Sequence, residues 1–153
     1  RFTADIGYLG TGDRTFDFNY DALQTGRRTV SNMNADGVLQ DCSAKLFRGT
    51  IDFQKGAAGS KGDEKEDVLL LGEDVVNRTI PLILCAEEDV EGNHGASIGQ
   101  LDEDILFYMN SRGLSRAEAE LLITHSKLEA LCAKANDPGL TDRVHRYLEE
   151  NAQ

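Results

Sequence analysis

The sequence lacks tryptophan altogether and is poor in basic residues. Its 153 residues carry 16 lysines and arginines against 27 aspartates and glutamates, a formal net charge of −11. This balance argues against a general nucleic-acid binder, because neutralising phosphate groups requires clustered lysine and arginine. The absence of tryptophan also weighs against a sugar-binding groove, which usually contains aromatic platforms. The simplest role for the excess of acids is to keep the protein soluble.

Long apolar runs are missing as well. No stretch approaches the roughly 20 apolar residues needed to span a bilayer, and residues 1–10 lack a signal-peptide pattern. We therefore expect a cytoplasmic protein that does not contact a membrane. The chain begins at Arg1 rather than at Met, which suggests a processed start or a boundary within a longer protein.

Cysteines are few, and common catalytic motifs are absent. Cys42, Cys85 and Cys132 are an odd number at scattered spacing, which is neither a disulfide framework nor a CxxC metal knuckle. Reduced thiols in a cytosolic protein fit best. The sequence contains no P-loop, GxSxG or HExxH motif. We predict that the chain is not an enzyme.

The first part of the chain, from Arg1 to about Leu101, shows the pattern of a β protein. Short apolar or alternating runs are typical of strands at residues 2–6, 15–20, 45–53, 68–71 and 79–85. Many short strands separated by turn residues favour a sandwich, a barrel or a β-solenoid, and no strict repeat period is apparent to decide among them. The polar, glycine-containing segment from Gln54 to Asp67 is predicted to be a mobile loop.

The remaining residues, from Asp102 onward, show the pattern of three short helices. The acids at 102–104 suit a first helical turn because they complement the helix dipole, and Gly113 suits its end. Ser115 and Glu118 form a capping box that begins a second helix. After a break at residues 138–139, Thr141 is expected to cap a third.

The second helix is predicted to have one apolar face. The residues expected on that face are Ala117, Leu121, Leu122, His125, Leu128 and Leu131. Three short helices alone would make a poor hydrophobic core. We therefore expect them to pack on the β part or on a partner.

The run at residues 88–113 resembles the C-terminal signature of the SufB/SufD family of iron–sulfur cluster assembly proteins. In SufD-like members, a strand ending in His-Gly-Ala-Thr leads to Leu-Asp-Glu, then to Leu-Phe-Tyr, and closes with Ser-Arg-Gly-Ile. The counterparts here are His-Gly-Ala-Ser at 94–97, Leu-Asp-Glu at 101–103, Leu-Phe-Tyr at 106–108 and Ser-Arg-Gly-Leu at 111–114. A match over about 25 positions is far more specific than a short motif.

Weaker matches upstream extend the resemblance from about Met33 to about Leu131. They lie at residues 35–39, 47–51, 68–71 and 79–81, in the order that the β part of the family would have them. The chain therefore resembles only the C-terminal part of a full-length SufB/SufD protein.

This resemblance implies a right-handed parallel β-helix at residues 1–101 followed by a small helical domain at 102–153. It implies a scaffold component that pairs through its β-helix with a SufB/SufD-like chain or with an identical copy. The helical domain would dock on a SufC-like ATPase, whose ATP-driven dimerisation would strain the scaffold and expose a nascent cluster site. A transient iron–sulfur cluster or iron would belong to the assembled complex, and no tightly bound cofactor is expected.

Departures from the family pattern indicate which branch the chain is closer to. SufD-like proteins often have a cysteine two residues before the histidine, where this chain has Gly92. SufB-like proteins have a glutamate after the histidine, where this chain has Gly95, so the motif is closer to SufD. Glu66 stands where the SufB branch has the cysteine proposed to start cluster assembly. This replacement weakens any claim that the chain holds a cluster by itself.

His94 is the first candidate ligand for a metal. A neutral imidazole binds iron, and a carboxylate from the acidic group Glu87 to Glu91 can fix its tautomer. Alternatively, His94 caps the β part and the acids form a solvated strand end. Cys85 is the second candidate, as a soft thiolate ligand. Its alternative is a small hydrophobe buried in an apolar strand.

The best candidate for a partner interface lies in the first two predicted helices. Phe107, Tyr108 and Arg112 are residue types that concentrate binding energy in interfaces, and Leu121 extends the surface. Alternatively, the aromatic residues attach the helix to the end of the β part. Two other functions remain open: a β-solenoid enzyme acting on polysaccharide, or a plain protein-interaction module.

Overall fold

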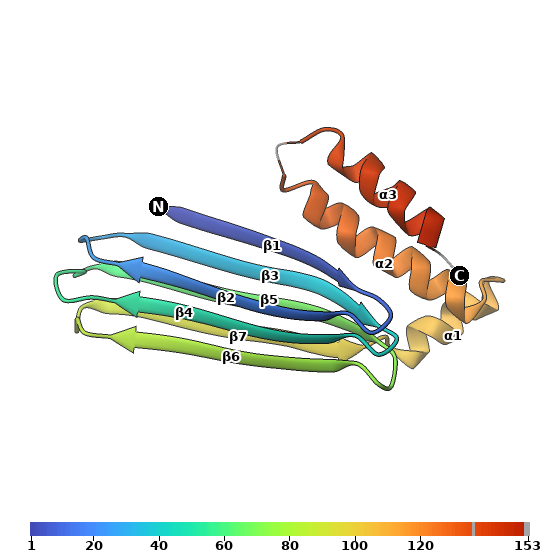
Figure 1. Cartoon of the computed structure of the whole chain (residues 1–153), viewed down its shortest axis with the longest axis horizontal. Helices are drawn as coiled ribbons and strands as arrows, with labels where there is room; N and C mark the ends of the chain where they lie inside the picture. Colours follow the sequence, from blue (N-terminus) through green and yellow to red (C-terminus); the bar gives the residue numbers. More distant parts are fainter. Residues whose placement is uncertain (136, 152–153) are drawn as a thin grey trace.

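A computed structural model describes residues 1–135 and 137–151 of the chain. Within these residues seven strands come first and three helices follow (Figure 1). Their bounds are β1 Phe2–Gly10, β2 Thr15–Gln24, β3 Val30–Gln40, β4 Ala44–Phe53, β5 Ser60–Leu71, β6 Val76–Cys85, β7 Val90–Gln100, α1 Glu103–Ser111, α2 Arg116–Cys132 and α3 Leu140–Asn151. The predicted order of a β part followed by helices is confirmed.

The strands wind into a parallel β-helix made of two sheets. Odd-numbered strands form one sheet in the order β1-β3-β5-β7, and even-numbered strands form the other in the order β2-β4-β6. Every pair is parallel, and each strand pairs with the strand two positions along the chain. This is the predicted β-helix, whereas a sandwich or closed barrel would contain different pairings.

The solenoid repeats about every 30 residues. Phe2 pairs with Ser31, Val30 with Lys61, and Ser60 with Val90, which are shifts of 29, 31 and 30 residues. The repeat is hidden in the sequence because its length varies from turn to turn. The residues that stack on one another also differ in chemistry. Gly10 of β1 pairs with Leu39 of β3, and Glu64 of β5 pairs with His94 of β7.

The core lies between the two sheets and follows the two-residue period of the strands. Along β4, Lys45, Phe47, Ile51 and Phe53 are fully buried, Gly49 in the same row is also buried, and the residues that alternate with this row are only half-buried. One cluster joins Met33 to Ile51 and Phe53. Burying each large apolar side chain contributes about 1.5–3 kcal/mol, so this alternation stabilises the stack of strands.

The structure corrects the prediction of a mobile loop from Gln54 to Asp67. Only residues 54–59 form a turn, where Gly56 and Gly59 have φ angles of +100° and +74° that favour glycine. From Ser60 onward the segment is strand β5. The prediction failed because β5 buries charged residues on its inner face, so its alternation does not have the usual apolar signature. Strands β3 and β7, in which Asn and Gly interrupt the apolar pattern, were not among the predicted strands.

The first two helices begin where the sequence indicates. Asp102 caps α1 by accepting a hydrogen bond from the Asp104 N–H, and the capping box of Ser115 and Glu118 is present at the start of α2. Gly113 follows α1 with a φ angle of +96°. Thr141 was predicted to cap the third helix, but it lies within that helix, because α3 already begins at Leu140.

The buried face of α2 is displaced from the one predicted. Its buried residues are Ala119, Thr124, Leu128 and Cys132. Ala117 is exposed, and Leu122 is 53% exposed. The sequence pattern shows where apolar residues cluster, but the element against which a helix packs decides which side becomes buried.

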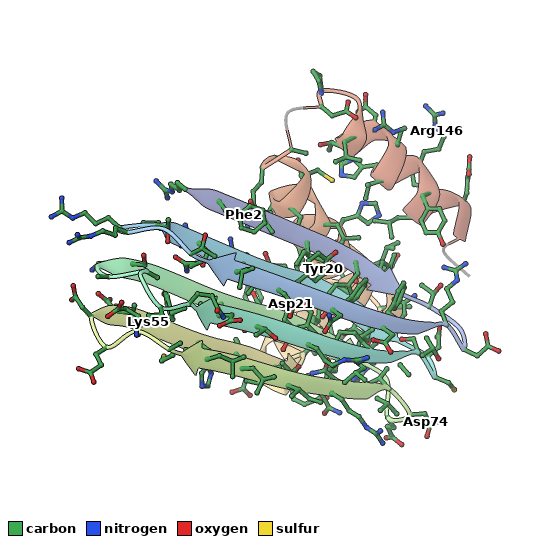
Figure 2. The ribbon with its side chains drawn as sticks, turned by 60° about the vertical axis from the view of Figure 1, so that its left-hand side comes forward. Phe2, Tyr20, Asp21, Lys55, Asp74 and Arg146 are labelled. Carbon is green, nitrogen blue, oxygen red and sulfur yellow. The ribbon has the colours of Figure 1, made fainter. Side chains whose placement is uncertain are left out.

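Helix α2 lies on the outer face of the odd-numbered sheet, where it contacts β1 and β3. The turns between consecutive strands lie at the two ends of the strands (Figures 1 and 2). Leu131 contacts Gly7 of β1, where an added Cβ would lie 3.3 Å away. Lys134, just beyond α2, pairs with Asp5 at 3.5 Å and with Asp36 at 3.1 Å. Lys127 of α2 pairs with Asp67 of β5 at 2.8 Å, so the helical part is attached across the odd-numbered sheet from β1 to β5. Within the described ranges, no helix is long and apolar enough to cross a membrane.

Candidate functional site

The end of the β-helix formed by β6 and β7 holds both candidate metal ligands. His94 lies on β7, and its Cα partner on β5 is Glu64. Paired residues of parallel strands place their side chains on the same face, so His94 continues the row of the buried Glu64. His94 is nevertheless exposed, because β7 is the last strand of its sheet in the described residues.

Cys85, the last residue of β6, continues the inner row of the other sheet. Its Cα partner is Phe53, which is fully buried, but Cys85 itself is exposed. The alternative that Cys85 is a buried small hydrophobe is therefore wrong. Cys132 is buried in α2, and Cys42 is exposed in a turn.

His94 and Cys85 do not converge. Gly92 faces Ile83, since an added Cβ would lie 2.8 Å from that side chain. From this contact His94 lies two residues along β7 in one direction and Cys85 two residues along β6 in the other. At about 3.3 Å per residue, they stand roughly 13 Å apart along the strands. Among the described residues, no three side chains of His, Cys, Asp and Glu form a group that could hold a metal ion.

The acidic residues that precede His94 have partners of their own. Glu87 accepts a hydrogen bond from the Gly56 N–H at 3.1 Å, and this bond is the largest contribution to the lowered pKa of its carboxyl. Glu91 accepts one from Lys61 at 2.5 Å, which lowers the Glu91 pKa in the same way. These contacts fit the alternative of a charged strand end stabilised by turn and surface interactions.

Apolar side chains surround this end of the β-helix. Four residues of β6 and one of β7 are 42–47% exposed: Val76, Ile80, Leu82, Leu84 and Ile98. As edge strands, β6 and β7 also leave backbone hydrogen-bonding groups free along one side. An apolar strand edge of this kind is typical of a surface that pairs with another chain.

A buried charge pair lies deeper in the β-helix, and the sequence did not reveal it. Lys45 of β4 and Glu66 of β5 form an ion pair whose side chains are 0% and 2% exposed. Thr79 of β6 donates a hydrogen bond to Glu66 Oε2 at 2.5 Å and accepts one from Lys45 Nζ at 3.3 Å. Burial lowers the pKa of Lys45. Three strands are thereby linked inside the stack.

Glu64 adds a second carboxyl to this buried cluster. It is 3% exposed, and its Oε2 atom has no hydrogen-bond partner among the described residues. Desolvation, followed by repulsion from Glu66, raises the pKa of Glu64 to about 7. Its carboxyl occupies the space opposite Gly49, where an added Cβ would lie 2.5 Å away. The two-residue spacing of Gly62, Glu64, Glu66 and Val68 is the signal that would have placed these acids inside.

The candidate partner interface on the helices is exposed. Phe107 is 75% exposed and Tyr108 58%, and the guanidinium of Arg112 lies 5.2 Å from the centre of the Tyr108 ring. Leu106, at 2% exposed, is the residue that attaches α1 to the rest of the fold. The alternative in which the aromatic residues attach the helix is therefore wrong. Leu121, half-buried on α2, lines a hollow together with Leu114 and Leu122.

Comparison with known proteins agrees with the family resemblance seen in the sequence. The family described as "SUF system FeS cluster assembly, SufBD core domain" matches residues 1–127. The iron–sulfur cluster assembly protein SufD of Bacillus subtilis is 30% identical over 145 residues, which are 95% of this chain and 33% of the relative. SufD of Escherichia coli is 28% identical over 107 residues, 70% of this chain and 25% of the relative.

A further similarity is to a longer protein. An iron–sulfur cluster assembly SufBD family protein of Mycobacterium tuberculosis is 32% identical over 121 residues, 78% of this chain and 14% of the relative. The chain thus spans a third or less of the length of these relatives. Two of the three carry the name SufD, in agreement with the SufD-like signature around His94. The chain belongs to the SufBD family of iron–sulfur cluster assembly proteins.

Proposed function

We propose that this chain is part of a non-enzymatic scaffold for iron–sulfur cluster assembly in the cytoplasm. Residues 1–101 would supply part of a β-helix and residues 102–153 a domain that docks on a SufC-like ATPase. The observation that supports this most directly is the exposure of Phe107 and Tyr108 on a helix whose own attachment depends on Leu106. Large aromatic side chains left in solvent beside an arginine are typical of a binding surface.

Pairing with a SufB/SufD-like chain, or with an identical copy, would use the end of the solenoid formed by β6 and β7. Its free strand edge and its exposed apolar residues support this role. Neither iron nor a cluster could be held by His94 alone, and Cys85 stands too far along the strands to share a metal with it. We therefore propose that the second chain supplies further ligands and that iron or a transient cluster is cargo of the pair.

The docking surface can be tested by co-purification. Full-length protein carrying Phe107→Ala and Arg112→Ala should lose its SufC-like ATPase, with circular dichroism showing an unchanged fold. Leu23→Ala with Arg27→Ala is a matched control, because it also removes one exposed apolar and one exposed basic side chain, but from the β part. Retained binding by the first variant, or equal loss by both, would move the interface elsewhere.

The role of His94 can be tested by anaerobic reconstitution with iron and sulfide. In the complex of full-length protein and its partner chain, His94→Ala should reduce iron uptake, and Cys85→Ser is expected to have a smaller effect. His125→Ala, on α2, is the control for loss of a histidine outside the β-helix. Equal iron uptake by wild type and His94→Ala would remove the case for this residue.

A further inference from the structure

Two histidines outside the β part meet between the helices α2 and α3. The ring centres of His125, on α2, and His145, on α3, are 5.1 Å apart, and the ring planes are inclined by 55°. Both side chains are half-buried. Glu129 lies one helical turn after His125, and its Oε2 atom is 4.0 Å from His145 Nε2. Two imidazoles and a carboxylate from two different helices are therefore gathered at one place.

One nitrogen of this group lacks a partner. His145 Nε2 is shielded from solvent and has no hydrogen-bond partner among the described residues. Its separation of 4.0 Å from the Glu129 carboxylate is too long for a hydrogen bond. A polar atom that is buried without a partner costs free energy, because it has lost water and gained nothing in return. A ligand that bonds to this nitrogen would remove that cost.

The spacing of the two rings suits a single divalent metal ion. Zn²⁺ binds imidazole nitrogens at about 2.0–2.1 Å in a tetrahedral arrangement, which places two ring centres about 5 Å apart. A nitrogen and a carboxylate oxygen on the same ion would be about 3.4 Å apart. Glu129 is therefore slightly too distant, in agreement with the lack of a complete three-ligand group among the described residues. Its side chain is 60% exposed, so a small rotation can bring the carboxylate closer.

Solvent and ions can reach this place. An open hollow of about 520 Å³ is lined by both histidines and by Glu129. Glu118 and Ser126, which also line it, are exposed on α2. The hollow has room for the water molecules that would complete the coordination of an ion held by two imidazoles.

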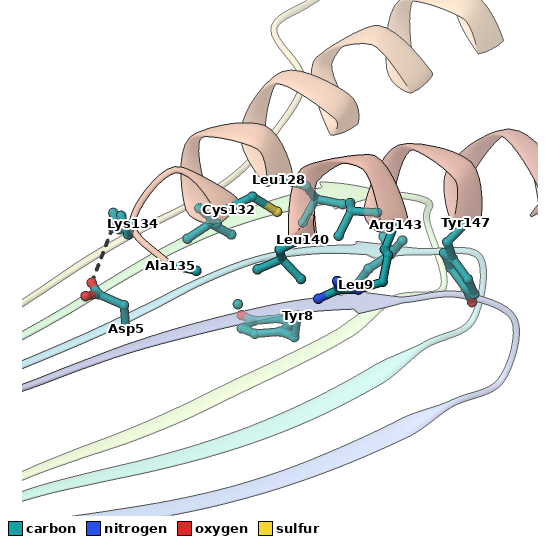
Figure 3. A pocket seen from close by; sticks show the side chains of 13 residues that line it. Asp5, Tyr8, Leu9, Leu128, Cys132, Lys134, Ala135, Leu140, Arg143 and Tyr147 are labelled. Carbon is teal, nitrogen blue, oxygen red and sulfur yellow. Dashed lines mark hydrogen bonds and ion pairs between the residues drawn. The ribbon is translucent and has the colours of Figure 1, made fainter. Parts of the chain in front are cut away.

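Helix α3 has few other attachments that would hold it to the rest of the molecule. An apolar hollow of about 500 Å³ lies between α3, α2 and β1 (Figure 3). Among the α3 residues whose burial is described, only Leu148 is fully buried. A hydrogen bond of 2.8 Å from Arg14 to the Tyr147 hydroxyl ties the helix to the β1–β2 turn. A metal ion shared by α2 and α3 would add an attachment where packing is sparse.

We propose that His125 and His145 bind one Zn²⁺ ion or a similar divalent ion, with Glu129 as a further ligand, and that this ion fastens α3 to α2. Imidazole ligands suit Zn²⁺, Ni²⁺ and Cu²⁺, and Fe²⁺ binds the same ligands more weakly. The ion is therefore structural and is distinct from the iron that the scaffold would carry as cargo. This inference goes beyond the proposed function and does not depend on it.

Hydrogen exchange of the full-length protein, first treated with a chelator, tests the proposal. Saturating Zn²⁺ should slow exchange in α3 at least about tenfold, because the ion binds only while α3 lies on α2. His145→Gln should abolish this slowing. Arg146→Gln, at the neighbouring exposed position of α3, is the matched control and should retain it. No slowing in the wild type, or equal responses of the two variants, would overturn the proposal.

X-ray absorption of zinc bound to the wild-type protein covers the case in which a variant does not fold. The proposed site should give nitrogen and oxygen neighbours at about 2.0–2.1 Å, with the outer scattering of imidazole rings. Sulfur neighbours at about 2.3 Å would place the ion on cysteines and overturn the proposal. Neither measurement involves the ATPase or iron, so failure of this proposal is distinguishable from failure of the proposed function.

Discussion

The ion pair of Lys45 and Glu66 is the residue-scale feature that departs most from an ordinary β-helix interior. Removing two charges from water costs several kcal/mol each, and the mutual attraction repays this only with good geometry and further hydrogen bonds. Thr79 supplies such bonds to both partners. A hydrophobic pair of similar volume would fill the same space equally well. We infer that the charges specify which residues face each other across the two sheets.

This inference predicts a difference between single and double substitutions. Lys45→Met alone should lower the free energy of unfolding by about 3–5 kcal/mol, because Glu66 is left charged and buried. Lys45→Met combined with Glu66→Leu should recover most of that loss. Urea unfolding of the full-length protein measures both. A double variant as unstable as the single variant would mean that the loss comes from removing the ion pair itself and not from leaving Glu66 buried without its partner.

The buried carboxyl of Glu64 predicts that the free energy of unfolding depends on pH. Its folded-state pKa is about 7, above the ordinary value of 4.5, so the folded protein binds the proton more tightly than the unfolded chain. The contribution of Glu64 is therefore fully present below pH 4.5 and is lost as the pH rises to about 7. Stability measured from pH 5 to pH 7.5 should fall less steeply in Glu64→Gln than in wild type. Parallel curves would show that Glu64 is not buried in this way.

At the scale of single elements, the sequence pattern predicted strands whose buried face is apolar and failed where the buried face is polar. Strand β4 was predicted because aromatic and aliphatic residues alternate, and α2 because its capping box is unambiguous. Only the end of strand β5, residues 68–71, was predicted, since Glu64 and Glu66 on its inner face are typical of solvent-exposed loops. The separation of His94 from Cys85 could not be predicted either, because it depends on how two sheets align across the core and not on sequence spacing.

Two glycines on different strands of the odd-numbered sheet, β3 and β7, should respond very differently to substitution. A Cβ at Gly37 of β3 would overlap the ring of Tyr8, whereas nothing lies within 4 Å of the same atom at Gly95 of β7. Gly37→Ala should therefore destabilise the protein by about 1–3 kcal/mol, and Gly95→Ala should be close to neutral. Thermal unfolding of the two variants gives the comparison. A neutral Gly37→Ala would mean that Tyr8 can move aside.

At the scale of the whole molecule, the helices are held less firmly than the central strands of the solenoid. Strands β3, β4 and β5 have a paired neighbour on each side, and they contain most of the fully buried side chains. Among the residues whose burial is described, α3 buries only Leu148 to less than 9% exposure. The helices are attached to the sheet largely through α2 and through the ion pairs of Lys127, on α2, and Lys134, just beyond it.

This difference between strands and helices predicts the order in which their backbone amides exchange hydrogen with solvent. Amides of β3, β4 and β5 should be the slowest to exchange, those of α2 intermediate and those of α3 the fastest, by at least about tenfold relative to the central strands. Mass spectrometry on the full-length protein resolves these segments. Binding of the ATPase should slow exchange in α1 and α2 if the docking surface is correct. Protection of α3 equal to that of β4 would contradict the unequal attachment.

The exposed edge formed by β6 and β7 has a consequence for assembly. A stack of parallel strands has two unlike ends, and contacts between unlike ends repeat without closing, so they build open filaments. In the proposed pairing the β6 and β7 edges of two chains face each other, so each edge is used up in one encounter. Growth at this edge would then stop at two chains, a finite particle in place of a fibre.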